Sequence, residues 1–401
     1  MKRLINGFLF LVVLSVAATA SGQTETGEVE NQLKNLKSSD FQTAWDASQR
    51  LAEFPQDKSK IVPRLVEALK YDWNQCTGDI RDSIAYTLNE FDAKETVPDL
   101  LKLLRSGKTL EHECSSSSCF FIPVTPADEV SARAYDPFCR QGVLMAVNKM
   151  ADSTHHKEIM SLITAGISRP ELLITLAEGG TPATADFIAR FKDEKDFEVR
   201  RSVATALGLV KNDALSVPIL IRYLEEDGNF YVKWAATESL TMIGRESKSS
   251  TLMQELAKLM TKSDKLAVVL SARALAMLGD QKGLLKLREL AADADAKIRF
   301  EAILALGVAA DKGSTDLLIK RLGDANLVVR AGAMYALGQT GNIALTSVIQ
   351  TAFTDAETYQ KELKDRFREN TTTLHNVYGV NVYNLEVTFE EAIRALNKVE
   401  D

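Results

Sequence analysis

Histidine is scarce in this chain of 401 residues, and its scarcity excludes one kind of catalytic centre. The sequence holds four histidines, too few to build a metal centre from several histidine–carboxylate pairs. The pair His155-His156 follows a predicted helix, and we interpret it as a solvated turn rather than a ligand pair. The chain also lacks a glycine-rich phosphate loop, a nucleophile elbow and a metalloprotease helix. We therefore predict that the protein is not an enzyme and binds no cofactor or metal.

Proline and aromatic residues are also few. The chain has nine prolines and 7% aromatic residues, against 45% hydrophobic and 26% charged residues. This composition is that of a folded protein, and it suits helices better than β-sandwiches or disorder.

Long apolar runs are absent after the first twenty residues. Those residues begin with Lys2 and Arg3, continue through an apolar run over 4–18, and end in the small residues Ala18-Thr19-Ala20. This is the pattern of a secretory signal peptide, and the run is shorter than the ~20 residues that span a bilayer. We predict a signal peptide over 1–20, no membrane insertion after its cleavage, and a protein that is periplasmic or secreted.

An excess of positive charge is missing too. The net charge is −7, and removal of two positive charges with the signal peptide takes it to −9. Because an acidic chain repels phosphate backbones, nucleic acid is not an expected partner.

Cysteine occurs only four times, at Cys76, Cys114, Cys119 and Cys139. In an exported chain an even, clustered set favours disulfides, and we predict the pairs Cys114–Cys119 and Cys76–Cys139. The alternative is a zinc site made by His112 with the last three cysteines. That alternative would make the protein an enzyme or an accessory subunit with a metal or cofactor at this cysteine-rich segment.

A repeat occupies residues 40–354. It is anchored at nine positions, which are Thr43, Ile80, Cys139, Ser168, Val199, Val232, Ala267, Ile298 and Val329. After the first two gaps the interval is 29 to 35 residues, and the residue eight after every anchor is apolar. The residue four after is nearly always apolar and mostly small, so each anchor starts a helix with one apolar stripe. A turn and a second apolar-periodic segment follow, which predicts nine stacked αα-hairpins.

The units running from Val199-Arg200 to Ala206-Leu207-Gly208, and their equivalents at Ile298 and Val329, resemble the HEAT-repeat superfamily. The likeness is strongest to the short bacterial repeats similar to those of phycobilin lyases. It implies an all-α, right-handed α-solenoid. It also implies a structural ladder of hydrogen bonds between acidic residues before the anchors and basic residues after them. The acidic members are Asp227, Asp293 and Asp324, and the basic ones are Arg81, Arg140, Arg169, Arg200, Lys233, Arg299 and Arg330.

Some proteins of that superfamily are enzymes, and the sequence departs from each. The di-iron hydroxylases use several His-Glu pairs, whereas this chain has only His112-Glu113. DNA glycosylases need a cationic groove, which the acidic balance opposes. Phycobilin lyases act on cytoplasmic chromophores, whereas the predicted signal peptide places this chain elsewhere.

The resemblance therefore favours a scaffold that binds a protein or peptide partner. In HEAT-like arrays the second helix of each hairpin lines the concave face, so the resemblance nominates polar residues of those segments. These are Arg222, Tyr223, Arg288, Lys320 and Arg321; ordinary solvated positions are the alternative interpretation.

Three segments lie outside the repeat. Residues 21–39 are polar and predict a flexible leader. The insertion 106–137 carries Phe120 and Phe121, and either covers the neighbouring hairpin or forms a partner-binding loop. Residues 355–401 are expected to cap the end of the array, with helices over 359–370 and 389–398.

Overall fold

The computed structural model describes residues 25–70, 80–105, 141–167, 169–178, 180–210, 212–367 and 392. These residues form helices joined by turns, without a strand among them. The all-α prediction is confirmed. The chain divides into two compact units, Met1–Thr96 and Val97–Asp401. The four cysteines, the signal-peptide segment, the insertion 106–137 with Phe120 and Phe121, and the histidine of the alternative zinc site lie outside the described residues.

The described residues of the first unit form four α-helices, which are α1 (Glu25–Asn35), α2 (Phe41–Leu51), α3 (Lys58–Ala68) and α4 (Ile80–Glu90). α2 packs between α1 and α4. The prediction of a flexible leader is therefore wrong from residue 25 onward. Val29, Leu33 and Leu36 are buried, because their spacing of four and three places them on one side of α1. The polar composition of the segment hid this short stripe.

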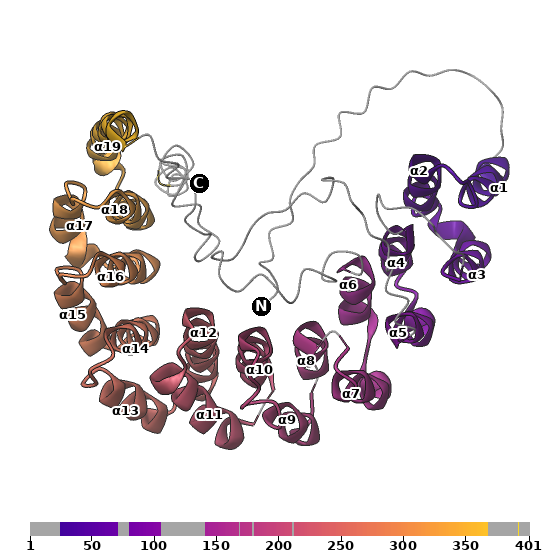
Figure 1. Cartoon of the computed structure of the whole chain (residues 1–401), viewed down its shortest axis with the longest axis horizontal. Coiled ribbons are helices and arrows are strands. Elements are labelled where there is room, and N and C mark those ends of the chain that lie inside the picture. The colour runs from indigo at the N-terminus through magenta and orange to yellow at the C-terminus, as the bar shows by residue number, and fades with distance from the viewer. Residues whose placement is uncertain are drawn as a thin grey trace. The chain divides into compact units, whose positions relative to one another are not determined.

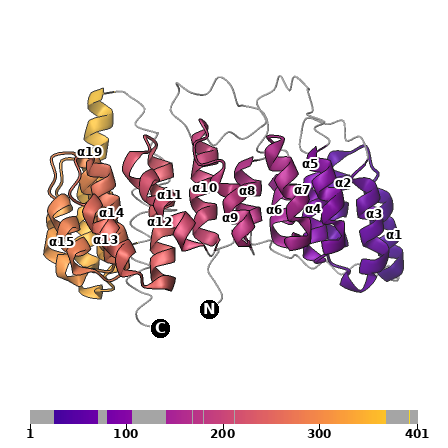
Figure 2. The same cartoon turned by 90° about the horizontal axis from the view of Figure 1, so that it is seen from below.

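The second unit consists of two rows of helices. One row holds the helices that start near the anchors: α6 (Gln141–Met150), α8 (Arg169–Ala177), α10 (Phe197–Leu209), α12 (Phe230–Ser247), α14 (Lys265–Met277), α16 (Ala296–Val308) and α18 (Leu327–Gln339). The other holds the second helices: α5 (Val97–Arg105), α7 (His156–Thr164), α9 (Pro182–Ala189), α11 (Asp213–Glu226), α13 (Ser250–Leu259), α15 (Gln281–Leu290), α17 (Thr315–Arg321) and α19 (Thr346–Phe367). Successive helices of each row lie side by side along an arc (Figure 1), and their axes run nearly parallel when seen from below (Figure 2). The predicted stack of hairpins is confirmed.

Short 3₁₀ turns join several of the helices in both units. They are η1 (Pro55–Asp57), η2 (Lys94–Thr96), η4 (Ser153–His155), η5 (Lys312–Ser314) and η6 (Ile343–Leu345).

The sequence period explains both the core and the spacing of the rows. The leucines eight residues after the anchors, such as Leu207 and Leu306, are fully buried. Neighbouring first helices touch through small residues: a Cβ added to Gly307 would lie 2.6 Å from the Cα of Ala336. A larger residue at position 307 would hold α16 and α18 apart.

Side-chain caps start the first helices at fixed points. Each cap accepts a hydrogen bond from a backbone N–H of the first turn, which satisfies a donor that the helix leaves open. The caps are Asp196, Asn229, Asp264, Asp295 and Asn326.

The C-terminal end differs from the prediction at one boundary and shows one close contact. α19 continues through residue 355 as a single helix, because no glycine or proline interrupts it. Ala392 is helical and buried. A Cβ on Gly338 would lie 2.6 Å from the Cα of Ala392, the same kind of contact that Gly307 makes with Ala336. Ala392 therefore lies directly against α18.

None of the helices in the described parts of the chain is both long and apolar enough to cross a membrane.

Candidate partner-binding surface

The second helices of the second unit lie on the outer side of its arc. The outer row consists of α11, α13, α15 and α17, and the inner row consists of α10, α12, α14, α16 and α18 (Figure 1). The expectation that the second helices line the concave face is therefore wrong. A periodic chain does not mark which helix of a pair comes first, so the repeat could be divided at either helix. The curvature decides which row lies inside, and it is a property of the assembled rows.

The nominated residues of α11 serve packing between hairpins. Arg222 donates to Asp193 at 2.8 Å. Tyr223 is buried, and its hydroxyl donates to the carbonyl oxygen of Lys192 at 2.6 Å. Burial raises the pKa of Tyr223 above its ordinary value, so the hydroxyl stays protonated as a donor.

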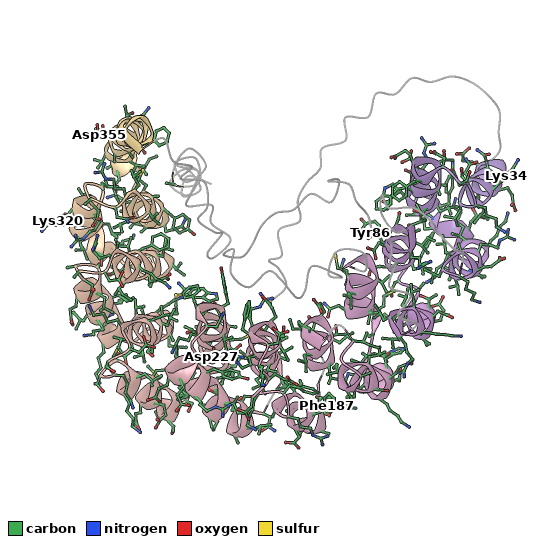
Figure 3. The ribbon with its side chains drawn as sticks, viewed as in Figure 1. Lys34, Tyr86, Phe187, Asp227, Lys320 and Asp355 are labelled. Atoms are coloured by element: carbon green, nitrogen blue, oxygen red, sulfur yellow. The ribbon has the colours of Figure 1, made fainter. Side chains whose placement is uncertain are left out.

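The nominated residues of α15 and α17 lie on the outer row as well. Arg288 pairs with Asp311 at 2.7 Å, and Arg321 lies 3.5 Å from Asp324. Lys320 is exposed on the outer side of α17 (Figure 3). Of the five, Lys320 alone has neither burial nor an ion pair within the described chain.

The predicted ladder is present between successive repeats. Arg200 donates to Asp227 at 2.7 Å, and Arg299 donates to Asp324 at 2.9 and 2.8 Å. The hydrogen bond to Asp227 raises the pKa of Arg200. Burial raises the pKa of Asp324, but the hydrogen bonds from Arg299 and from the backbone N–H of Asn326 outweigh it and hold that pKa below its ordinary value. These pairs fix one repeat against the next.

The seventh repeat also forms an ion pair with the next repeat, but through a different residue. Ala267 has no basic residue directly after it. Instead Lys265, two residues before that anchor, donates to Asp293 at 2.8 Å. The ion pair between the sixth and seventh repeats joins Lys233 to Asp264 at 3.0 Å. The ladder thus continues where the sequence motif is broken.

The inner side of the arc is formed by the faces of the first helices that turn away from the hairpin core. At 3.6 residues per turn, positions two and six after an anchor lie about 160° from the middle of the core stripe. The position ten after lies about 120° from it. These positions include Trp234 and Glu238 on α12 and Arg273 on α14.

An apolar row follows this side across four helices. It consists of Leu209, Met242, Met277 and Val308, each ten residues after its anchor. The first three are half-buried, and Val308 is 37% exposed. One member of the row also packs between neighbouring helices, since a Cβ added to Gly208 on α10 would lie 3.0 Å from Cε of Met242 on α12.

An aromatic cluster stands at the start of α12 and consists of Phe230, Tyr231 and Trp234. The Phe230 ring lies 5.5 Å from the Tyr231 ring, edge to face, and 6.3 Å from the Trp234 ring, stacked. The guanidinium carbon of Arg273 lies 4.3 Å from the centre of the Trp234 ring. Nζ of Lys297 lies 5.1 Å from the centre of the Phe230 ring. The cluster therefore joins side chains of α12, α14 and α16.

Neither the apolar row nor the aromatic cluster was predicted from the sequence. A signal is nonetheless present in the sequence, since residues 266–277 are apolar except for Ser271 and Arg273. A helix that is apolar beyond one stripe has more than one partner surface.

His155 and His156 belong to a helix start. Asp152 accepts from the N–H of Thr154 at 2.9 Å, and the ring of His155 accepts from the N–H of Asp152 at 3.2 Å. His156 is buried, and burial is the main cause that lowers its pKa. Within the described part of the chain, no three His, Cys, Asp or Glu side chains gather closely enough to hold a metal ion.

Antiparallel helix hairpins stacked in two parallel rows, with each hairpin packed against the hairpins before and after it, define the class of α-solenoids. A family profile described as HEAT repeats matches residues 168–241, 184–258, 217–307 and 284–360. Residues 168–360 of this chain are therefore HEAT repeats.

Solved structures with a similar arrangement come from proteins of different kinds. An engineered protein is 19% identical, with a TM-score of 0.33, over 93% of this chain and 99% of that chain. The CpcE–CpcF complex of phycocyanin lyase from Nostoc is 15% identical, with a TM-score of 0.29, over 86% and 99%. Human deoxyhypusine hydroxylase in complex with glycerol is 15% identical, with a TM-score of 0.29, over 78% and 99%. No curated protein sequence matches this chain significantly.

Proposed function

We propose that this protein is an exported scaffold that binds a protein or peptide partner along the inner side of its second unit, and that it catalyses no reaction. The observation that carries the proposal is the apolar row together with the aromatic cluster. Both lie on the first helices and keep part of their apolar surface exposed: Val308 is 37% exposed, and the three rings of the cluster are half-buried.

The side chains on this surface are of the kind that dominates binding energy in protein interfaces. Aromatic residues and arginine are enriched among the residues whose truncation costs most affinity, and methionine adapts to irregular partner shapes. Covering half-exposed apolar side chains contributes about 25 cal/mol per Å² of apolar surface removed from water. A chain with a net charge of −7 favours a polypeptide over a nucleic acid as the partner.

Site-specific photo-crosslinking tests the proposal. A benzophenone amino acid replaces Val308 on the inner row, or Leu285, which is 61% exposed on α15 in the outer row. The protein is then irradiated in the cells that produce it. We expect a defined crosslinked polypeptide from position 308 and none from position 285. We also expect Trp234→Ala to abolish the crosslink while the helical circular dichroism is retained.

Equal crosslinking from both positions would overturn the assignment of the inner side. Turnover of a substrate by the purified protein would overturn the non-catalytic part.

A further inference from the structure

Two ring faces of the aromatic cluster already carry cations from other helices. Arg273 covers Trp234 and is itself only 7% exposed. Lys297 covers Phe230 and is exposed. A cation within about 6 Å of a ring centre is attracted by the negative face of the ring. The rings are therefore presented in the geometry that cation binding requires.

Lys297 is held more loosely than Arg273. It reaches from α16 past α14 to a ring of α12. Among the residues that the structure describes it makes no ion pair, whereas Arg273 donates from Nε and Nη2 to Glu238 at 3.2 and 2.9 Å. A cationic side chain that a partner brings to this surface can replace Lys297 on Phe230, because no salt bridge of the described chain has to break.

Glu238 offers a second point of attachment. Both hydrogen bonds from Arg273 go to Oε1 of Glu238, and its side chain is 50% exposed. Oε2 takes no hydrogen bond from a described residue. Phe230, Trp234 and Glu238 follow one another at intervals of four on α12, so the Cα atoms of the first and last lie about 12 Å apart.

We infer that the partner presents a basic segment to this site. One lysine or arginine side chain takes the place of Lys297 on Phe230, and a second, about 12 Å away, pairs with Glu238. In an extended segment this distance corresponds to about four residues. The net charge of −7 attracts such a segment from a distance. The inference rests on the proposed function, because it names the chemistry of the partner at the same surface.

Two opposite charge changes test it with a defined probe. Calorimetry measures binding of a capped hexalysine peptide to the full chain at low salt. Lys297→Gln removes the competing cation, and we expect binding to tighten by about 3-fold or more. Glu238→Gln removes the acceptor, and we expect binding to weaken by about 3- to 10-fold. The matched controls on the outer row are Lys320→Gln and Glu255→Gln, which change the net charge equally.

The possible outcomes separate cleanly. If each inner variant changes the affinity for hexalysine as much as its outer control does, the peptide responds only to the net charge of the protein. The inference then fails. If capped hexaglutamate binds instead and Lys297→Gln abolishes that binding, the site recognises an acidic segment and the inference is wrong. In both cases a crosslink from position 308 would leave the proposed function standing, so the two failures are distinguishable.

Discussion

The guanidinium of Arg299 joins three segments of the second unit. It donates to both carboxylate oxygens of Asp324 and to the carbonyl oxygens of Asp293 and Ala294, at 2.8 to 2.9 Å. The Asp324 side chain is 4% exposed. Removing one partner of such a pair leaves a buried charge without compensation, which costs more than the pair contributes. The ladder therefore fixes the register of stacking more than it adds stability.

His156, at the start of α7, makes the stability of this part of the protein depend on pH. Its pKa is lowered, mainly because burial disfavours the charged form. The unfolded chain then binds more protons than the folded chain as the pH falls through the ordinary value of about 6.5. We expect the free energy of unfolding of the hairpin that contains α7 to be highest above that pH. It should decrease as the pH falls from 7.5 to 5.5.

Hydrogen exchange of the α7 amides at the two pH values checks this expectation. His156→Gln should remove most of the pH dependence. An unchanged pH dependence in the variant would show that another group is responsible.

At the scale of elements, the spacing of neighbouring helices depends on single glycines. A Cβ on Gly307 would lie 2.6 Å from the Cα and 2.8 Å from the Cβ of Ala336. We expect Gly307→Ala to destabilise the protein by about 1 to 3 kcal/mol, because α16 and α18 must move apart. Gly228→Ala is the control, since a Cβ there would meet nothing within 4 Å. Urea titrations of both variants measure the difference.

A similar loss in the two variants would mean that intrinsic glycine effects, and not the helix contact, set the stability. The predicted sequence motif Ala-Leu-Gly thus has a physical reason in two of its three positions. The leucine fills the hairpin core, and the glycine permits the approach of the next helix.

Helix existence was largely predictable, whereas helix ends and surfaces were less so. The apolar stripe at intervals of four residues identified the first helices, because burial of that stripe is what makes a helix stable in a protein. α1 was missed because its stripe contains only three apolar residues within a polar segment. The boundary at residue 355 was misplaced because loss of the repeat period does not end a helix.

At the scale of the whole molecule, stability is distributed along the array. The helices of each repeat pack mainly against those of the repeats before and after it, so damage to one repeat should stay local. Leu306 is fully buried, and we expect Leu306→Ala to cost about 2 to 5 kcal/mol. Hydrogen exchange should accelerate in α14 to α18 and remain unchanged in α8 to α10. A uniform acceleration through the second unit would contradict the local model of unfolding.

Export and oxidation of the cysteines remain predictions of the sequence. We expect the mature chain to begin near Ser21 outside the cytoplasm, with the pairs Cys114–Cys119 and Cys76–Cys139. Amino-terminal sequencing and non-reducing peptide mapping check them. An intact segment 1–20 on cytoplasmic protein would refute export. Free thiols at all four positions in exported protein would refute the pairing and return the zinc alternative to consideration.

The sequence by itself determined the all-α class of fold and the positions of the helices that carry the anchors, and the resemblance to HEAT repeats implied the ladder. Each of these depends on contacts that recur at a fixed spacing along the chain, so the pattern of residue types records them. Only the tertiary structure decided which row lies on the inner side, and it thereby moved the candidate surface from Arg222 and Arg288 to the aromatic cluster. The physical reason is that curvature arises from the packing of many helices at once. The meeting of Lys297 with Phe230, two helices apart, follows from that curvature and from no local pattern.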